Sequence, residues 1–187
     1  VLQNTSHSVN IKERLDFSCA IFDPTGSLVA NAPHIPVHLG AMGESISTVI
    51  RERRSAMKHG DVYTLNTPYN GGTHLPDITV ITPVFDGAGE ELLFFVGSRA
   101  HHSEIGGISP GSVPPRSTSI DEEGVLIDNF CLVDGGRFRE TEVRELFSAG
   151  AWPTRNMEQN LADLRAQIAA NEKGVQELHR IIDEFGL

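Results

Sequence analysis

Two strongly β-prone segments separated by a five-residue turn place the firmest limit on how this chain can fold. Residues 78–85 read ITVITPVF and residues 91–101 read ELLFFVGSRAH, and both are rich in branched and aromatic side chains. The intervening DGAGE contains the aspartate and glycines that tight turns favour. We therefore predict an antiparallel β-hairpin whose two outer ends, away from the turn, lie side by side.

Further strand signals surround this hairpin. FSCAIFD at 17–23 and SLVAN at 27–31 flank the turn residues DPTGS, which predicts a second hairpin. Additional strands are expected at 61–66 and 124–136. The proline-containing segment 31–38 is expected to be extended and irregular, because proline disfavours helix both at its own position and before it.

Helical periodicity appears in three places. Residues 39–57 predict an amphipathic helix, and residues 138–149 predict a short one. A long helix is expected at 156–185, because apolar residues recur there every three or four positions; these are Leu161, Leu164, Ile168, Val175, Leu178, Ile182 and Phe185. This apolar stripe fits either a helix docked on its own core or half of a helix–helix contact. An ordered loop is expected at 106–119.

These elements together predict an α+β fold. It would contain a mixed, largely antiparallel sheet built from hairpins, with flanking helices and a long C-terminal helix. The 187 residues are enough for one domain or most of one. Because the sequence begins with Val1 and not with methionine, we expect a fragment of a longer polypeptide.

Composition excludes several classes of partner. The formal net charge of −10 disfavours binding to nucleic acid and anionic membranes. The sequence contains no run of about 18 apolar residues, the length that a membrane-spanning helix needs. The two cysteines, Cys19 and Cys131, form no C-x-x-C pair and are expected to be reduced and buried. We therefore expect a cytoplasmic protein.

Histidines and an aspartate gather at the outer ends of the central hairpin. His74 and Asp77 lie three residues apart in GGTHLPD, directly before the first strand, while His101 and His102 close the second. Two imidazoles and a carboxylate are recurring ligands of catalytic divalent metals. Strand alternation sends His101 and His102 to opposite faces, so one is expected to bind metal and the other to face substrate or the surroundings of the ligands. The same residues also fit a structural role as turn and capping groups.

Other candidates stand outside this hairpin. Glu13 and Asp16 precede the first strand, where a carboxylate can act as general base or metal ligand, or simply form a surface ion pair. His34 and His38 lie four apart, but the neighbouring prolines argue against a helical H-x-x-x-H site. The sequence contains neither a P-loop motif nor a dinucleotide fingerprint, so it offers no recognisable ATP site.

Several long blocks resemble the hydantoinase B/oxoprolinase family, in particular the C-terminal part of ATP-dependent 5-oxoprolinases. They are NIKERLDFSCAIFDPTGSLVANAPHIPVHLGAMGESI, GGTHLPDITVITPVF, SRAHHSEIGGISPGSVPP and NLADLRAQIAANEKG. The resemblance runs over essentially the whole chain, which would then be the N-terminal portion of a hydantoinase B-like domain. One departure is Thr67, in the stretch Asn66-Thr67-Pro68, where family members often have aspartate.

The resemblance implies an enzyme that hydrolyses a cyclic amide, 5-oxo-L-proline, to L-glutamate. ATP would be used by a separate hydantoinase A-like domain or subunit, within an oligomer. A divalent metal, Mn²⁺ or Zn²⁺, would be bound by His74, Asp77 and His101, while Glu13 and His102 would take part in the reaction. Alternatives are a subunit that hydrolyses N-methylhydantoin or hydantoin, and a non-catalytic assembly module.

Overall fold

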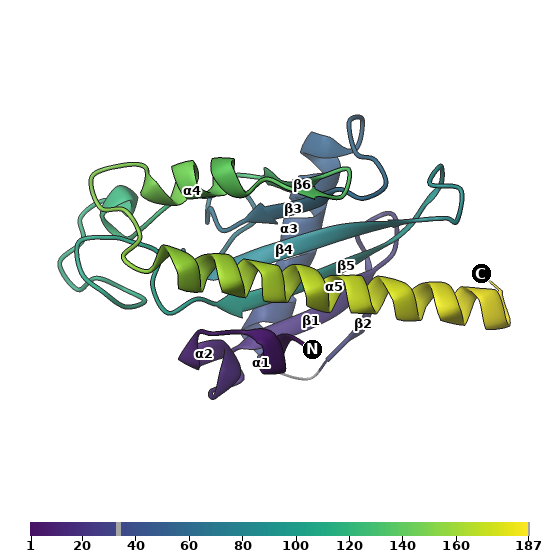
Figure 1. Cartoon of the computed structure of the whole chain (residues 1–187), viewed down its shortest axis with the longest axis horizontal. Coiled ribbons are helices and arrows are strands. Elements are labelled where there is room, and N and C mark those ends of the chain that lie inside the picture. The colour runs from purple at the N-terminus through teal and green to yellow at the C-terminus, as the bar shows by residue number, and fades with distance from the viewer. Residues whose placement is uncertain (33–34, 187) are drawn as a thin grey trace.

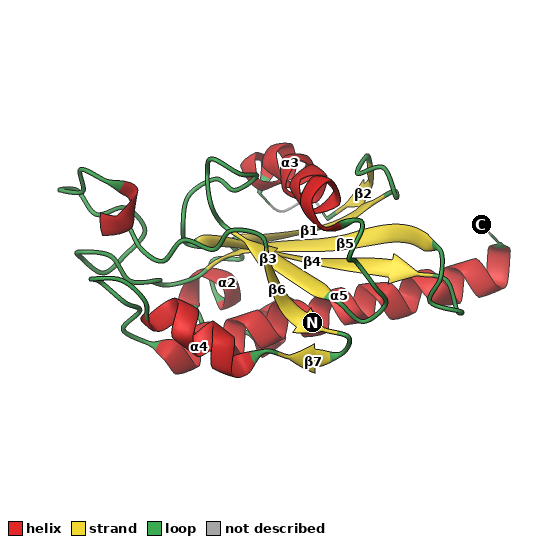
Figure 2. Ribbon diagram, turned by 90° about the horizontal axis from the view of Figure 1, so that it is seen from above, coloured by secondary structure: helices red, strands yellow, loops and turns green. Residues whose placement is uncertain are grey.

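A computed structural model describes residues 1–32 and 35–186, except the side chain of Leu39. Within this part of the chain, seven antiparallel strands form one sheet in the order β2-β1-β5-β4-β3-β6-β7 (Figure 1). Helices cover both faces of the sheet, and a long helix lies at the C-terminal end of the described chain (Figure 2). The predicted α+β class with a largely antiparallel sheet is confirmed.

The predicted central hairpin is confirmed. Strand β4, Asp77–Phe85, pairs with β5, Leu92–His101, and its first residue lies opposite the last residue of β5. All nine residues of β4 are buried, because helices cover the sheet on both sides of this strand. The outer ends of the hairpin therefore bring Asp77 and His101 into register.

The remaining strands extend the sheet on either side. On one side, β1, Phe17–Phe22, pairs with β5 and with the edge strand β2, Leu28–Asn31, which confirms the second hairpin. On the other side, β3, Val62–Leu65, pairs with β4 and β6. The strand predicted at 124–136 is shorter: only β6, Phe130–Asp134, is strand, and β7, Arg137–Phe138, follows it.

Helix α3, Pro36–Arg53, covers one face of the sheet. It starts earlier than the predicted residue 39, so the expectation that 31–38 is extended throughout is wrong for residues 36–38. Proline is tolerated in the first helical turn, where its missing N–H would have no partner, and Pro36 occupies that place. The buried residues Met42, Ile46 and Val49 pack this helix onto the sheet.

Helix α5, Met157–Phe185, crosses the opposite face and contacts β4 and β5. The first part of its predicted apolar stripe docks on the chain's own core, with Leu161 and Leu164 fully buried, whereas Phe185 is 76% exposed. Polar residues of α5 are also buried; these are Asn160, Asp163, Gln167 and Asn171.

Shorter helices complete the structure. Helices α1, Leu2–Thr5, and α2, Val9–Lys12, precede β1 and were not predicted. The predicted short helix is α4, Glu140–Ser148, and the loop predicted at 106–119 lies outside the helices and strands. A 3-10 turn, Ile120–Glu122, follows that loop. None of the described helices combines the length and apolarity needed to cross a membrane.

Candidate metal centre

The three candidate metal ligands named from the sequence converge at the outer end of the central hairpin. His74, Asp77 and His101 each offer a ligand atom, and these atoms all lie within 4.8 Å of one another. His74 Nδ1 is 2.9 Å from Asp77 Oδ2, and the rings of His74 and His101 are 5.1 Å apart between centroids. The hairpin thus gathers two imidazoles and a carboxylate, as its topology predicted.

Tight backbone packing brings His74 to this position. The backbone N–H of Asp77 donates to the carbonyl of His74 at 3.0 Å, which closes a turn at the start of β4. Upstream, a Cβ atom added to Gly72 would lie 2.0 Å from the carbonyl oxygen of Asn66, so only glycine fits there. The Asn66 side chain in turn bonds the backbone of Leu75 at 2.8 Å. The loop is therefore anchored on both sides of His74.

His101 and His102 face opposite sides of the sheet, as strand alternation requires. His101 points toward the cluster, and its Nδ1 lies 2.7 Å from the side-chain amide of Asn10. His102 is fully buried against α5, with Nδ1 2.9 Å from Asn160 Oδ1 and Nε2 3.1 Å from Gln167 Oε1. Of the two histidines, it is therefore His101 that joins the candidate ligand set.

A third imidazole, that of His38, lies beside the cluster, although this histidine ranked low among the candidates from the sequence because of the neighbouring prolines. His38 is buried, and its Nε2 is 3.5 Å from Asp77 Oδ1 and 3.7 Å from Asp16 Oδ1. Its Nδ1 is 3.3 Å from Ser18 Oγ. Recognising that Pro36 can begin a helix would have placed His38 on the sheet-facing side of α3. The companion candidate His34 lies outside the described residues.

Hydrogen bonding and burial set the charges of the cluster. Burial of Asp77 opposes ionisation, but the nearby imidazole of His38 and the hydrogen bond with His74 outweigh it and hold the pKa of the carboxyl well below its usual range. The hydrogen bond to Asp77 raises the pKa of His74, whereas burial lowers the pKa of His101. Asp77 is thus an anion, as metal binding requires.

The donor set suits a borderline divalent cation. Imidazole nitrogen and carboxylate oxygen together are typical ligands of Zn²⁺ and Mn²⁺. Asp77 Oδ1 is buried and makes no hydrogen bond of good geometry with any described residue, although His38 lies at ion-pair distance. Three protein ligands of this kind would leave coordination positions free for water and substrate, as in catalytic metal sites.

The carboxylates near the site take different places. Asp16 is partly exposed, and its backbone carbonyl accepts a hydrogen bond from the N–H of His101 at 3.0 Å. Glu13 follows α2, with an exposed side chain that forms no ion pair among the described residues. Glu104, which sequence reasoning overlooked, is largely buried and accepts hydrogen bonds from the backbone of Arg155 and Asn156 at 2.8 and 3.0 Å. It therefore fastens the segment after β5 to the start of α5.

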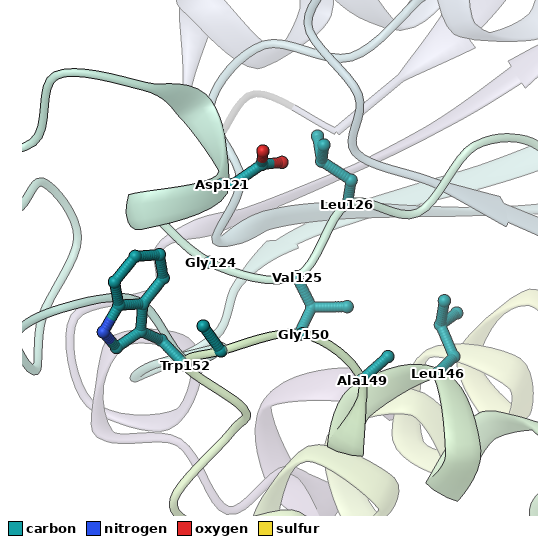
Figure 3. A pocket seen from close by; sticks show the side chains of 9 residues that line it. Asp121, Gly124, Val125, Leu126, Leu146, Ala149, Gly150 and Trp152 are labelled. Carbon is teal, nitrogen blue, oxygen red and sulfur yellow. The ribbon is translucent and has the colours of Figure 1, made fainter.

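A separate open pocket of about 370 Å³ lies between the loop at 121–126 and the connection from α4 to α5 (Figure 3). Trp152, Leu126 and Leu146 supply its largest apolar side chains, and Asp121 lies at its edge. None of the candidate metal ligands lines this pocket.

The sequence of the whole chain matches one protein family. The sequence model of the family described as hydantoinase B/oxoprolinase matches residues 1–187. The chain therefore belongs to the hydantoinase B/oxoprolinase family, which confirms the resemblance drawn from its sequence blocks.

Individual relatives are larger proteins. The chain is 50% identical over 194 residues to 5-oxoprolinase 1 from Arabidopsis thaliana, and the match covers all of this chain but 15% of that relative. The crystal structure of an ATP-dependent caprolactamase from Pseudomonas jessenii matches with a TM-score of 0.84 and 29% identity, covering 92% of this chain and 29% of that one. A nucleotide-free acetone carboxylase structure matches with a TM-score of 0.90 over 100% of this chain and 24% of that one; at 20% identity this likeness shows the fold alone.

Proposed function

We propose that this chain carries the divalent-metal hydrolytic centre of an ATP-dependent enzyme that opens 5-oxo-L-proline to L-glutamate. The observation that carries the proposal is the convergence of His74, Asp77 and His101 on one point. The 50% identity to a protein named 5-oxoprolinase supports the choice of substrate. The chain would be the N-terminal portion of a hydantoinase B-like domain in a larger cytoplasmic enzyme.

His74, Asp77 and His101 would hold Mn²⁺ or Zn²⁺. Such an ion, when bound, supplies a Lewis acid and makes a nearby water more acidic. The low pKa of Asp77 keeps its carboxylate ionised, and the burial of His101 favours the neutral imidazole that can donate a lone pair. The half-exposed His74, whose side chain is 37% exposed, forms the solvent side of the cluster. Substrate would therefore approach from the His74 side.

Asp16 and His38 are placed to handle a proton. The side chain of Asp16 is 32% exposed, so Oδ1 can take a proton from a water, and His38 Nε2 lies 3.7 Å from that oxygen. His38 is held from its other ring nitrogen by Ser18. We favour Asp16 over the nearby Glu13 as general base, because Asp16 is joined to the cluster through His38. Glu13 and His102 stay predictions from the sequence.

The ring amide needs activation before water can open it. We propose that a hydantoinase A-like domain or subunit transfers the γ-phosphoryl group of ATP to the lactam oxygen and releases ADP. A first water then attacks the ring carbon and Asp16 accepts its proton. The ring C–N bond breaks as the nitrogen takes up a proton, which leaves an acyl phosphate. A second water hydrolyses the acyl phosphate to the carboxylate and releases phosphate. The products are glutamate, ADP and phosphate, so ATP is consumed outside this chain.

The test is an assay of the complete enzyme with 5-oxo-L-proline and ATP, measuring glutamate by chromatography and phosphate by colorimetry. We expect both products in equal amounts from the wild-type enzyme, and none above background from His74→Ala. The matched control is His59→Ala, because His59 is an exposed histidine outside the cluster. If the wild-type enzyme releases no glutamate, 5-oxo-L-proline is not its substrate. If His74→Ala keeps full activity, the proposed metal centre is wrong.

A further inference from the structure

A buried arginine shares a sheet face with the candidate metal ligands. Arg99 precedes His101 by two residues in β5, so their side chains leave the same face of the sheet. Across the hairpin, Arg99 pairs with Thr79 and His101 pairs with Asp77. Arg99 is 0% exposed and is among the largest fully buried side chains of the described chain. Burying a charge is costly, so an arginine here needs a reason.

The contacts of Arg99 are directed at hydroxyl groups. Its Nε donates to Thr79 Oγ1 at 2.8 Å, and its Nη2 donates to Ser45 Oγ at 2.7 Å. Nη1 has no hydrogen-bond partner among the described residues. Burial lowers the pKa of Arg99 to about 10, and the negative charge of Asp77 opposes this shift, so the guanidinium stays charged at neutral pH. Among the described residues, Arg99 forms no ion pair, and its buried charge is stabilised by hydrogen bonds to two hydroxyl groups.

Ser45 passes this contact on to the loop that carries His74. Its hydroxyl donates to the carbonyl oxygen of Gly71, three residues before His74. A guanidinium can only donate hydrogen bonds, so Ser45 Oγ must accept from Arg99 and is left to point its own proton at Gly71. Gly71 has a φ of +85°, and a Cβ there would lie 2.7 Å from Thr48 Oγ1. Helix α3 and the loop are therefore in close contact at Gly71, where the Ser45 hydroxyl donates to the loop backbone.

We propose that Arg99 is a positioning residue of the metal centre. It orients the Ser45 hydroxyl toward Gly71, and so holds the loop with His74 against the strands that carry Asp77 and His101. The inference rests on the proposed function, because it assumes that His74 is a metal ligand. An apolar side chain would fill the same volume without the cost of a buried charge, but it would leave Ser45 free to rotate.

The test is a titration of the complete, metal-free protein with Co²⁺, followed by the visible absorption bands of the bound ion. We expect Arg99→Met and Ser45→Ala each to weaken Co²⁺ binding about 10-fold or more and to alter the spectrum, as loss of a group supporting a ligand does. The double variant should lose no more than the worse single variant, because both changes break one chain of contacts. Arg99→Lys, which can still donate to Ser45, should recover part of the affinity.

A matched control is Arg54→Met, since Arg54 is exposed and its side chain, among the described residues, donates only to the carbonyl of Pro24. Its Co²⁺ affinity and spectrum should equal those of the wild type. If Arg99→Met fails to fold, Ser45→Ala alone decides, and an unchanged Co²⁺ affinity in it overturns the inference. Fully additive losses in the double variant would overturn it as well.

The same titration separates this inference from the proposed centre. Wild-type protein that binds no Co²⁺, or a His74→Ala variant that binds it as well as the wild type, overturns the metal centre itself. Wild-type binding that His74→Ala abolishes, together with unchanged binding in Arg99→Met and Ser45→Ala, overturns only the role of Arg99.

Discussion

His38 Nε2 lies 3.5 Å from Oδ1 of Asp77, while His74 Nδ1 lies 2.9 Å from Oδ2 of the same carboxylate. One carboxylate is thus held between imidazoles from helix α3 and from the loop before β4. Oδ2 contacts the candidate ligand His74, whereas Oδ1 lies at ion-pair distance from the buried His38. His38 is therefore placed to orient the Asp77 carboxylate through Oδ1.

Substituting His38 should weaken metal binding without removing a ligand. We expect His38→Gln to lower Zn²⁺ affinity about 10- to 100-fold, which is the usual cost of losing a group that orients a ligand. The measurement is competition with a chromophoric chelator. His59→Gln is the matched control, because His59 is exposed and its ring contacts Phe85 instead of the cluster. Equal affinity in His38→Gln and wild type would contradict the supporting role.

The pair formed by His74 and Asp77 predicts a pH dependence of stability in the metal-free protein. The raised pKa of His74 adds to the free energy of unfolding. This addition is complete below about pH 6.5 and is lost as pH rises through the pKa of the folded state. The lowered pKa of Asp77 also adds to the free energy of unfolding. This addition is present above about pH 4 and is lost as pH falls through the pKa of the folded carboxyl. The pair is therefore most stabilising between about pH 4 and 6.5.

This window can be measured by urea denaturation with EDTA present. His74→Gln should lower the free energy of unfolding more at pH 5.5 than at pH 9. The difference should be at most about 1 kcal/mol, because the His74 side chain is 37% exposed and solvent screens the pair. A larger loss at pH 9 than at pH 5.5 would show that the sign is wrong.

Local patterns explain why the hairpin and its three ligands could be predicted. The register of an antiparallel hairpin follows from its turn, so residues before β4 and at the end of β5 must meet whatever else the chain does. His74, Asp77 and His101 were found in this way. The choice between His101 and His102 depended on which face each occupies, and that required the helix packed behind His102.

The residues that were missed or ranked low depend on contacts between distant segments. His38 reaches Asp77 because α3 crosses the sheet, and Arg99 reaches Gly71 through Ser45 of the same helix. No periodicity in the sequence predicts such crossings. The prolines near His38 were interpreted as helix breakers, although Pro36 stands where a helix accepts proline. Glu104 was overlooked, because its partners lie about fifty residues later.

Glu104 should be essential to the stability of the junction between β5 and α5. Its carboxylate accepts from the N–H groups of Gly106, Arg155 and Asn156, and from the hydroxyl of Thr154. In Glu104→Gln, an NH₂ group would face some of these donors, so we expect a loss of about 2 kcal/mol in the free energy of unfolding. Urea denaturation measures this loss.

The control for this prediction is Glu158→Gln, an exposed glutamate whose side chain is 74% accessible and pairs with Arg144. Surface ion pairs of this kind contribute roughly 0–1 kcal/mol. Hydrogen exchange should also show faster exchange at the N–H groups of Arg155 and Asn156 in Glu104→Gln alone. Unchanged exchange there would contradict the anchoring role of Glu104.

Gly72 offers the sharpest test of how the His74 loop is built. A Cβ atom at this position would lie 2.0 Å from the carbonyl oxygen of Asn66 and 2.7 Å from that of Thr67, so backbone must move in Gly72→Ala. We expect the loop to shift, Zn²⁺ affinity to fall at least about 10-fold, and unfolding to become easier by about 1–3 kcal/mol. Gly43→Ala is the matched control, because a Cβ at Gly43 in α3 meets nothing within 4 Å. That variant should keep wild-type affinity and gain up to about 1 kcal/mol from the better helix propensity of alanine. Equal Zn²⁺ affinities in the two variants would show that the close approach of Gly72 to Asn66 does not position His74.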